Sequence, residues 1–343
     1  MLHCWPRAWI WRRALVPGGA LEVEYFEMPT IEPTMFLHCR GCFPELIALA
    51  LLLFPSLGLA QQSAQQGDRD VWFPDSKFFS RPTASVREPT LGVGVLWSTV
   101  FRDRASPDER PPFDLQGGSG LETDTQGEAA LGGNYRIWQP TQWDDGGLTL
   151  GIQAGVFGRF RLEVSGNDLV ASDWIVALPA ELARGAWSGR LRLVHWSAHV
   201  GDELIEAGVE RVDFTTETVE ALVAYNSGDV RLYGGGAVVV RSSLENELQL
   251  GPAFSDDALI RFGADAQARP WRRDDVTAEV GLDWQISDRT DWASQLSVRL
   301  GLVVRDGVRS AGFNVVYHQG PSPMGQFFLA DERYWGIELN LVP

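Results

Sequence analysis

A chain of 343 residues with a formal net charge of −16 at pH 7 is long enough for one large domain or two ordinary ones. Such an acidic chain has no basic stripe to offer to phosphate groups, so we do not expect nucleic acid as a partner. The longest uncharged apolar run, 46–59, is shorter than the roughly 18 residues that a membrane-spanning helix needs.

That apolar run instead has the setting of a secretory signal peptide. Arg40 supplies a basic region before the run, and Gly58 and Ala60 are small residues at positions minus three and minus one of a cleavage point. A basic, an apolar and a small-residue region in this order are typical of export signals. We therefore expect residues 35–60 to be removed on export. A buried helix over 46–59 is the alternative.

Two further expectations concern the region before the cleavage point. Residues 1–34 are too polar and irregular for a signal peptide, so we expect them to be an upstream extension of a chain whose translation begins at Met35. All three cysteines also precede the cleavage point. The exported chain would therefore contain no disulfide and no cysteine-based metal site.

Residues 61–89 form the next segment, which is polar and shows no alternation. Pro74, Pro82 and Pro89 interrupt it, and proline disfavours regular strands and helices. We expect an N-terminal strap that lies either in the periplasm or inside the domain that follows.

From residue 90 onward, apolar and polar side chains alternate along the chain. In 294–305, for example, Leu300 and Leu302 share the apolar face, while Arg299 belongs to the opposite face. A period of two predicts a β-strand with one apolar and one polar face. Twelve such segments are expected, at 90–101, 128–139, 148–163, 170–182, 187–200, 211–225, 230–241, 257–268, 276–287, 292–305, 309–319 and 333–342.

The connections and the polarity of the two faces favour a membrane barrel. Short connections such as 226–230 alternate with long ones such as 242–256, as in outer-membrane proteins with tight periplasmic turns and long external loops. In lipid an open sheet edge is not tolerated, so the sheet has to close. We predict an all-β fold, a closed antiparallel transmembrane β-barrel of about 12 strands over residues 90–343, in a Gram-negative-type outer membrane. A water-soluble β-sandwich or lipocalin-like barrel is the alternative.

The last strand supports this prediction. Tyr334, Gly336, Leu339 and Leu341 follow the spacing of the signal through which the barrel assembly machinery binds the final strand of outer-membrane barrels. The chain departs from that pattern because it ends on Pro343 and not on an aromatic residue.

Several stretches, taken in order, resemble the bacterial outer-membrane family catalogued as domain of unknown function 1207. The resemblance covers nearly the whole exported chain and implies an outer-membrane barrel without an assigned activity. The stretches are FPDSKFFSRPTASVREP (73–89), AGVFGRFRLE (154–163), ASDWIVALP (171–179), HWSAHVGDELIE (195–206), LYGGG (232–236) and GQFF (325–328).

One segment carries a candidate catalytic site. His195 and Ser197 share the outward face of 187–200, near its upper end, and a hairpin centred near residue 205 places Asp213 beside Ser197 and Thr215 beside His195. A serine nucleophile needs an imidazole as base and an acceptor that orients the imidazole. This pair is similar to the His-x-Ser pair on the outer wall of outer-membrane phospholipase A and the lipid A deacylase, which implies an outer-leaflet lipid acyl hydrolase.

Two other interpretations of the same segment remain. His199, Asp202 and Glu203 could bind a metal ion, and calcium would suit the two carboxylates together with backbone carbonyls, although no loop here has a recognised calcium-binding spacing. Alternatively, the polar residues of this segment contact lipid headgroups or fix the external loop.

The inward faces carry many charges, which suggest either a plugged lumen or a narrow diffusion channel. Paired charges would form a plug, and unpaired charges would line a pore. The predicted inward set is Arg159, Arg161, Arg190, Arg192, Arg231, Arg241, Arg261, Arg299 and Arg305, with Glu163, Glu181, Asp265, Glu279, Asp283 and Glu338.

Overall fold

The computed structural model describes residues 70–103, 123–162, 167–206, 213–243, 258–270, 275–306 and 309–342. The chain divides into two units, Met1–Ala60 and Gln61–Pro343, and all described residues belong to the second. The predictions for 1–34 and 35–60, and for the first nine residues of the strap, lie outside the described residues.

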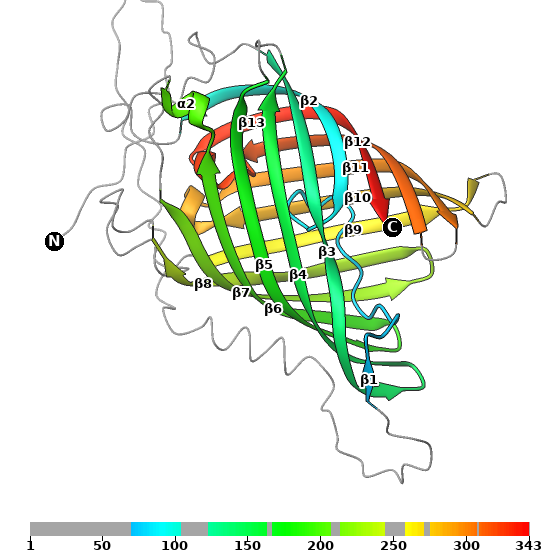
Figure 1. Cartoon of the computed structure of the whole chain (residues 1–343). Helices are drawn as coiled ribbons and strands as arrows, with labels where there is room; N and C mark the ends of the chain where they lie inside the picture. Colours follow the sequence, from blue (N-terminus) through cyan, green and yellow to red (C-terminus); the bar gives the residue numbers. More distant parts are fainter. Residues whose placement is uncertain are drawn as a thin grey trace, which may run out of the picture. The chain divides into compact units, whose positions relative to one another are not determined.

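The described chain consists almost entirely of strands (Figure 1). Each of the twelve predicted segments corresponds to one strand from β2 to β13, whereas the short strand β1 was not predicted. In the described ranges, no helix is long and apolar enough to cross a membrane. The elements are β1 (Val71–Trp72), β2 (Leu91–Asp103), β3 (Thr123–Trp143), β4 (Gly146–Arg161), β5 (Leu169–Arg184), β6 (Trp187–Val200), α2 (Asp202–Glu206), β7 (Phe214–Ser227), β8 (Val230–Ser242), β9 (Ala258–Ala268), β10 (Val276–Ser287), η3 (Asp288–Thr290), β11 (Ala293–Asp306), β12 (Arg309–Pro321), η4 (Gly325–Phe327) and β13 (Ala330–Val342).

The strands β2 to β13 close into a ring. Each pairs antiparallel with its neighbours in sequence, and the last strand pairs with the first, with Trp335 opposite Trp97. Their indole rings stack outside the ladder at 4.3 Å. Because every barrel strand has two partners, the ring has no open edge. The prediction of a closed twelve-stranded antiparallel barrel is confirmed.

The two ends of the barrel differ in their connections. Only two residues separate β3 from β4, β5 from β6, β7 from β8 and β11 from β12, and we call the end of the barrel where these strands meet the short-turn end. The strands that are separated by long stretches of sequence, such as β2 from β3, β6 from β7 and β8 from β9, have their consecutive ends at the opposite, long-loop end. This alternation is that of outer-membrane barrels.

The barrel is apolar outside and polar inside. In β11 the side chains of Leu300 and Leu302 are 58% and 42% exposed, whereas the inward Arg299 and Ser297 are 6% and 3% exposed. A water-soluble sandwich has the opposite arrangement, because its core is apolar. The outer wall therefore matches hydrocarbon, which defines a transmembrane barrel.

The described part of the strap lies inside this ring, where Figure 1 shows it between β1 and β2. Phe79 is buried against Leu222 and Tyr233 of the barrel wall. Arg231 of β8 donates hydrogen bonds to the carbonyl oxygens of Ser80 and Arg81, at 2.6 and 3.0 Å. Of the two positions considered for the strap, the described residues take the one inside the barrel.

The connection between β12 and β13 covers the long-loop end of the lumen. Its residues from Ser322 to Phe328 are all buried. Gln326 donates a hydrogen bond to the carbonyl oxygen of Ala198, and Arg87 of the strap donates one to the carbonyl oxygen of Pro323 at 2.9 Å. The strap and this loop therefore meet inside the barrel.

Candidate functional site

The outward His-x-Ser pair lies where the sequence predicts it. On β6 the side chain of His195 is 48% exposed on the apolar wall, and Ser197 lies two residues further along on the same face. Trp196, which lies between the two residues, and Ala198, which follows Ser197, belong to the opposite, inward face. The pair is about ten residues from the short-turn end, close to the long-loop end.

The predicted register between β6 and β7 was wrong by two positions. The β6–β7 ladder places Thr215 opposite Ser197 and Glu217 opposite His195. Nδ1 of His195 lies 3.3 Å from Oε1 of Glu217. The hairpin centre falls one residue later than expected. A one-residue shift of the centre moves every cross-strand pair by two and keeps the same face outward.

Asp213 itself lies just beyond the ladder, whose last pair is Ala198 with Phe214. The side chain of Asp213 is exposed, and its carbonyl oxygen accepts a hydrogen bond from the hydroxyl of Ser243 on the β8 side. Asp213 is therefore not placed beside His195. Glu217 takes the position in the predicted triad that was expected for Asp213.

A second charged side chain extends this outward row. Arg241 of β8 is opposite Glu217, with 3.7 Å between Arg241 Nε and Glu217 Oε2, and its side chain is 81% exposed. The prediction that Arg241 points into the lumen was wrong. A β-bulge after Glu217 places one extra residue, Val240, in β8 and reverses the alternation beyond it.

The chemistry of this row depends on its geometry. A carboxylate can only accept, so Nδ1 of His195 carries the hydrogen and Nε2 is left with a lone pair. Ser197 is on the same face of the same strand, and no hydrogen bond joins it to His195 in the described residues. Catalytic hydrogen bonds are often long before substrate binds. The row therefore supplies an oriented base beside a hydroxyl.

The predicted metal site does not assemble. Within the described ranges, no group of three His, Cys, Asp or Glu side chains is placed to hold a metal ion. His199 is exposed on the outer wall of β6, whereas Asp202 and Glu203 begin helix α2, where both are exposed. These three side chains do not fit a calcium ion.

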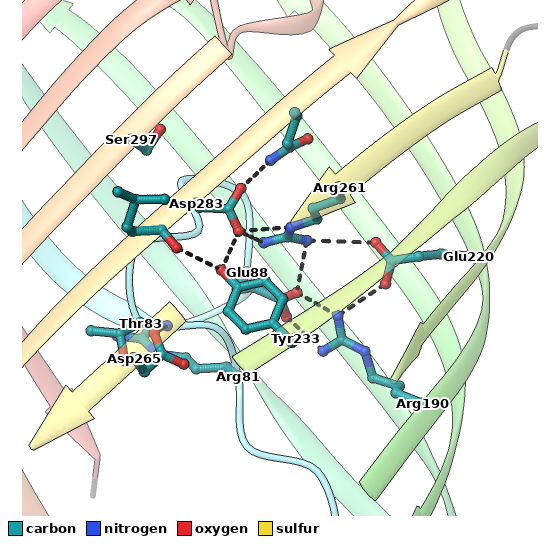
Figure 2. Close-up of polar contacts among 12 residues, drawn as sticks. Arg81, Thr83, Glu88, Arg190, Glu220, Tyr233, Arg261, Asp265, Asp283 and Ser297 are labelled. Carbon is teal, nitrogen blue, oxygen red and sulfur yellow. Dashed lines mark hydrogen bonds and ion pairs between the residues drawn. The ribbon is translucent and has the colours of Figure 1, made fainter. Parts of the chain in front are cut away.

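A large cluster of paired charges lies inside the barrel (Figure 2). Glu88 of the strap binds Arg190 at 2.6 Å and Arg192 at 3.3 Å, and lies 3.8 Å from Arg261. Glu220 of β7 binds the same three guanidinium groups from the barrel wall, at 3.0, 2.7 and 3.6 Å. Through Glu88, the strap is thus held to both β6 and β9.

The electrostatics of Glu88 are dominated by these cations. Burial by itself raises the pKa of Glu88, but Arg190, Arg192 and Arg261 outweigh burial and hold the pKa far below its ordinary value. Glu88 is therefore ionised at neutral pH. Its charge is what fastens the strap in the lumen.

The remaining inward charges are also largely paired, as the plug interpretation requires. Glu163 lies outside the described residues. The partners that the sequence did not identify include Glu88, Glu128, Asp173, Glu220 and Glu332. The pairs are Arg136 with Glu181, Arg159 with Glu128 and Glu332, Arg87 with Asp173, Arg231 with Asp265, Arg261 with Asp283, Arg299 with Glu338 and Arg305 with Glu279.

A buried Ser–His pair in the lumen was also missed. Ser297 of β11 lies 3.0 Å from Nδ1 of His318 on β12, and Nε2 of His318 lies 3.1 Å from the carbonyl oxygen of Pro321. His318 is fully buried and Ser297 is 3% exposed. Their inward positions could have been read from the alternation. Because substrate cannot reach them, we interpret this pair as a structural contact.

A closed ring of twelve antiparallel strands with a lipid-compatible wall and a charged, filled interior defines an outer-membrane-type β-barrel. The chain belongs to the family of proteins of unknown function DUF1207, whose model matches residues 119–341. No curated protein matches the sequence.

Several solved structures are similar to this chain. An active-site mutant of outer membrane phospholipase A from Escherichia coli has a TM-score of 0.50 at 11% identity, covering 78% of this chain and 94% of that chain. The transport unit of the Escherichia coli autotransporter AIDA-I has a TM-score of 0.38 at 14% identity, covering 78% and 94%. The outer membrane channel DcaP of Acinetobacter baumannii has a TM-score of 0.29 at 10% identity, covering 74% and 96%. These similarities concern the fold alone, and function has to be argued from the site.

Proposed function

We propose that this protein resides in the bacterial outer membrane and hydrolyses acyl esters of outer-leaflet lipids. Ser197 is the nucleophile, His195 the general base and Glu217 the group that orients the base. The observation that carries the proposal is the 3.3 Å contact between His195 Nδ1 and Glu217 Oε1 on the apolar outer wall, beside an outward serine.

The reaction takes the general course of serine esterases. Ser197 attacks the ester carbonyl of a lipid that lies against the wall, while Nε2 of His195 takes the hydroxyl proton. The imidazole then returns this proton to the departing alcohol. Water hydrolyses the acyl-serine by the same steps. Throughout, Glu217 accepts the Nδ1 hydrogen and stabilises the imidazolium.

The position of the site selects the outer leaflet. In outer-membrane barrels the short turns face the periplasm and the long loops face outside. With that orientation, His195 and Ser197 lie near the outer water interface, where the ester linkages of lipids meet the headgroups. The exposed guanidinium of Arg241, in the same row, is suited to a lipid phosphate.

The interior of the barrel argues against the alternative of a diffusion channel. Glu88 fixes the strap to β6 and β9, and the loop between β12 and β13 fills the long-loop end. Conduction needs a continuous water-filled path. We therefore propose a barrel that does not conduct and that serves as a rigid support for a site on its wall.

Two partners belong to this proposal. Outer-membrane lipids surround the barrel and also provide the substrate. The barrel assembly machinery would bind the last strand, where Gly336 and Leu339 keep the expected spacing.

The test uses the purified barrel with phospholipid in mixed micelles, with calcium in one arm and a chelator in the other. We expect wild type to release fatty acid and Ser197→Ala to lose at least about 10³-fold of that activity. Ser172→Ala is the matched control, since Ser172 is also an outward serine, on the adjacent strand opposite His199. Equal activity of wild type and Ser197→Ala, or none in wild type, would refute the proposal.

A further inference from the structure

A cavity remains in the lumen between the strap and the barrel wall. It has a volume of about 20 Å³. Arg81 and Ser85 of the strap line one side, and Arg299 of β11, Glu338 and Asn340 of β13 line the other. A space of this size holds one or two water-sized particles.

Hydrogen-bond donors without partners among the described residues lie along this cavity. Arg299 is 6% exposed, and its Nη2 is paired with Glu338 at 2.6 Å. Within the described ranges, its Nε and Nη1 have no hydrogen-bond partner, and neither does Nδ2 of Asn340. Buried donors in proteins are almost always satisfied, by protein, water or a ligand. These three donors therefore call for an acceptor inside the cavity.

One charge beside the cavity, that of Arg81, favours an acceptor that is negative. The carboxylates around the cavity are already engaged, Glu88 with Arg190 and Arg192, Glu128 with Arg159, and Glu338 with Arg299. Arg81 forms no ion pair or side-chain hydrogen bond with the described residues. In this part of the chain, its full positive charge therefore has no direct partner.

The pKa of Arg81 is consistent with a positive charge that lacks a direct partner. Burial, and next the like charge of Arg299, lower the pKa of Arg81 to about 10. Two guanidinium groups close to each other in a partly desolvated space repel, and an anion between them removes the repulsion.

We propose that a monatomic anion of the size of chloride binds in this cavity, between the guanidinium groups of Arg81 and Arg299 and the amide of Asn340. The small volume favours a monatomic ion. The ion ties the strap to β11 and β13, in addition to the contacts that Glu88 makes with β6 and β9. The proposal does not depend on the acyl hydrolase activity.

The direct test locates the ion. Crystals of the full barrel are soaked in sodium bromide, and anomalous scattering at the bromine edge identifies bound bromide. We expect a peak within hydrogen-bonding distance of Arg299 Nε and Asn340 Nδ2. A cavity that contains only water, or bromide found only elsewhere on the protein, would overturn the proposal.

The second test measures stability in solution. Thermal unfolding in detergent is followed while sodium gluconate is replaced by sodium chloride at constant ionic strength. If the dissociation constant is about 10 mM, 200 mM chloride shifts the folding equilibrium of wild type by about 20-fold. Arg81→Gln should lose this chloride dependence, and Ser197→Ala should keep it.

A matched control excludes a general salt effect. Arg305 is also a lumen arginine, but it is paired with Glu279 and does not line the cavity. Arg305→Gln should keep the full chloride response. A chloride response that is equal in wild type, Arg81→Gln and Arg305→Gln, or absent in wild type, would contradict the site.

Discussion

Glu217 is directly opposite His195 in the β6–β7 ladder, and its Oε1 lies 3.3 Å from His195 Nδ1 on the outer wall of the barrel. This contact decides which nitrogen of the imidazole carries the hydrogen. It leaves Nε2 as the acceptor for the proton of Ser197, which is what a serine esterase requires.

The first prediction concerns the orienting carboxylate. Glu217→Gln should reduce kcat for ester hydrolysis by on the order of 10²–10⁴-fold, because the amide no longer stabilises the imidazolium and can fix the wrong tautomer. Steady-state release of fatty acid from micellar phospholipid measures the change. Asp213→Asn is the control and should keep wild-type kcat. A larger loss of kcat for Asp213→Asn than for Glu217→Gln would contradict this prediction and favour Asp213 as the orienting carboxylate.

The alternation of side chains was enough to predict the fold but not the acidic partner. A period of two decides whether a segment forms a strand and which of its side chains face outward. β6 and β11 keep this period over their whole length. The partner of His195 depends on the centre of the β6–β7 hairpin, which lies one residue later than the sequence suggested. The outward position of Arg241 depends on a bulge in β8, and a bulge leaves no mark in the hydrophobic pattern.

The contents of the lumen were only partly predictable. The inward arginines could be identified strand by strand, and so could Glu220, which was overlooked. Their principal partner, Glu88, belongs to a segment without any period, so the sequence could not say that it crosses the lumen. The strap position is set by long-range ion pairs, which no local pattern encodes.

The second prediction concerns the stability of the strap. Glu88→Gln leaves Arg190 and Arg192 with one carboxylate fewer in a buried site, and we expect a loss of about 3–5 kcal/mol in the free energy of unfolding. Denaturant titration in lipid or detergent gives this value. Glu279→Gln should cost less than about 1 kcal/mol, because its partner Arg305 is 42% exposed. Equal costs for the two variants would mean that Glu88 does not fasten the strap.

The third prediction is the pH dependence of that stability. The pKa of Glu88 in the folded protein is lower than in the unfolded chain, so its ion pairs stabilise the fold above the ordinary carboxyl pKa of about 4.3. This contribution is lost as the pH falls toward the folded pKa. The difference in unfolding free energy between wild type and Glu88→Gln should be constant from pH 8 to about pH 5 and shrink below it. A difference that grows on acidification would have the wrong sign.

The fourth prediction concerns conduction. In planar bilayers wild type should show no stable conductance, because the strap and the loop between β12 and β13 fill the lumen. Removal of residues 70–89 should produce openings, since the barrel wall keeps its charged inward faces. Glu279→Gln, which leaves the strap in place, should remain closed. Stable channels in wild type would favour the diffusion-channel interpretation.

The most direct measurement of the central claim is covalent labelling with an alkyl fluorophosphonate, with peptide mapping of the product. The Ser–His neighbours in the described part of the barrel include the outward Ser197 with His195, the outward Ser172 opposite His199, and the buried Ser297 with His318. We predict modification of Ser197 in wild type and none in His195→Ala. An unlabelled Ser197, or labelling at Ser297 in its place, would contradict an esterase on the outer wall.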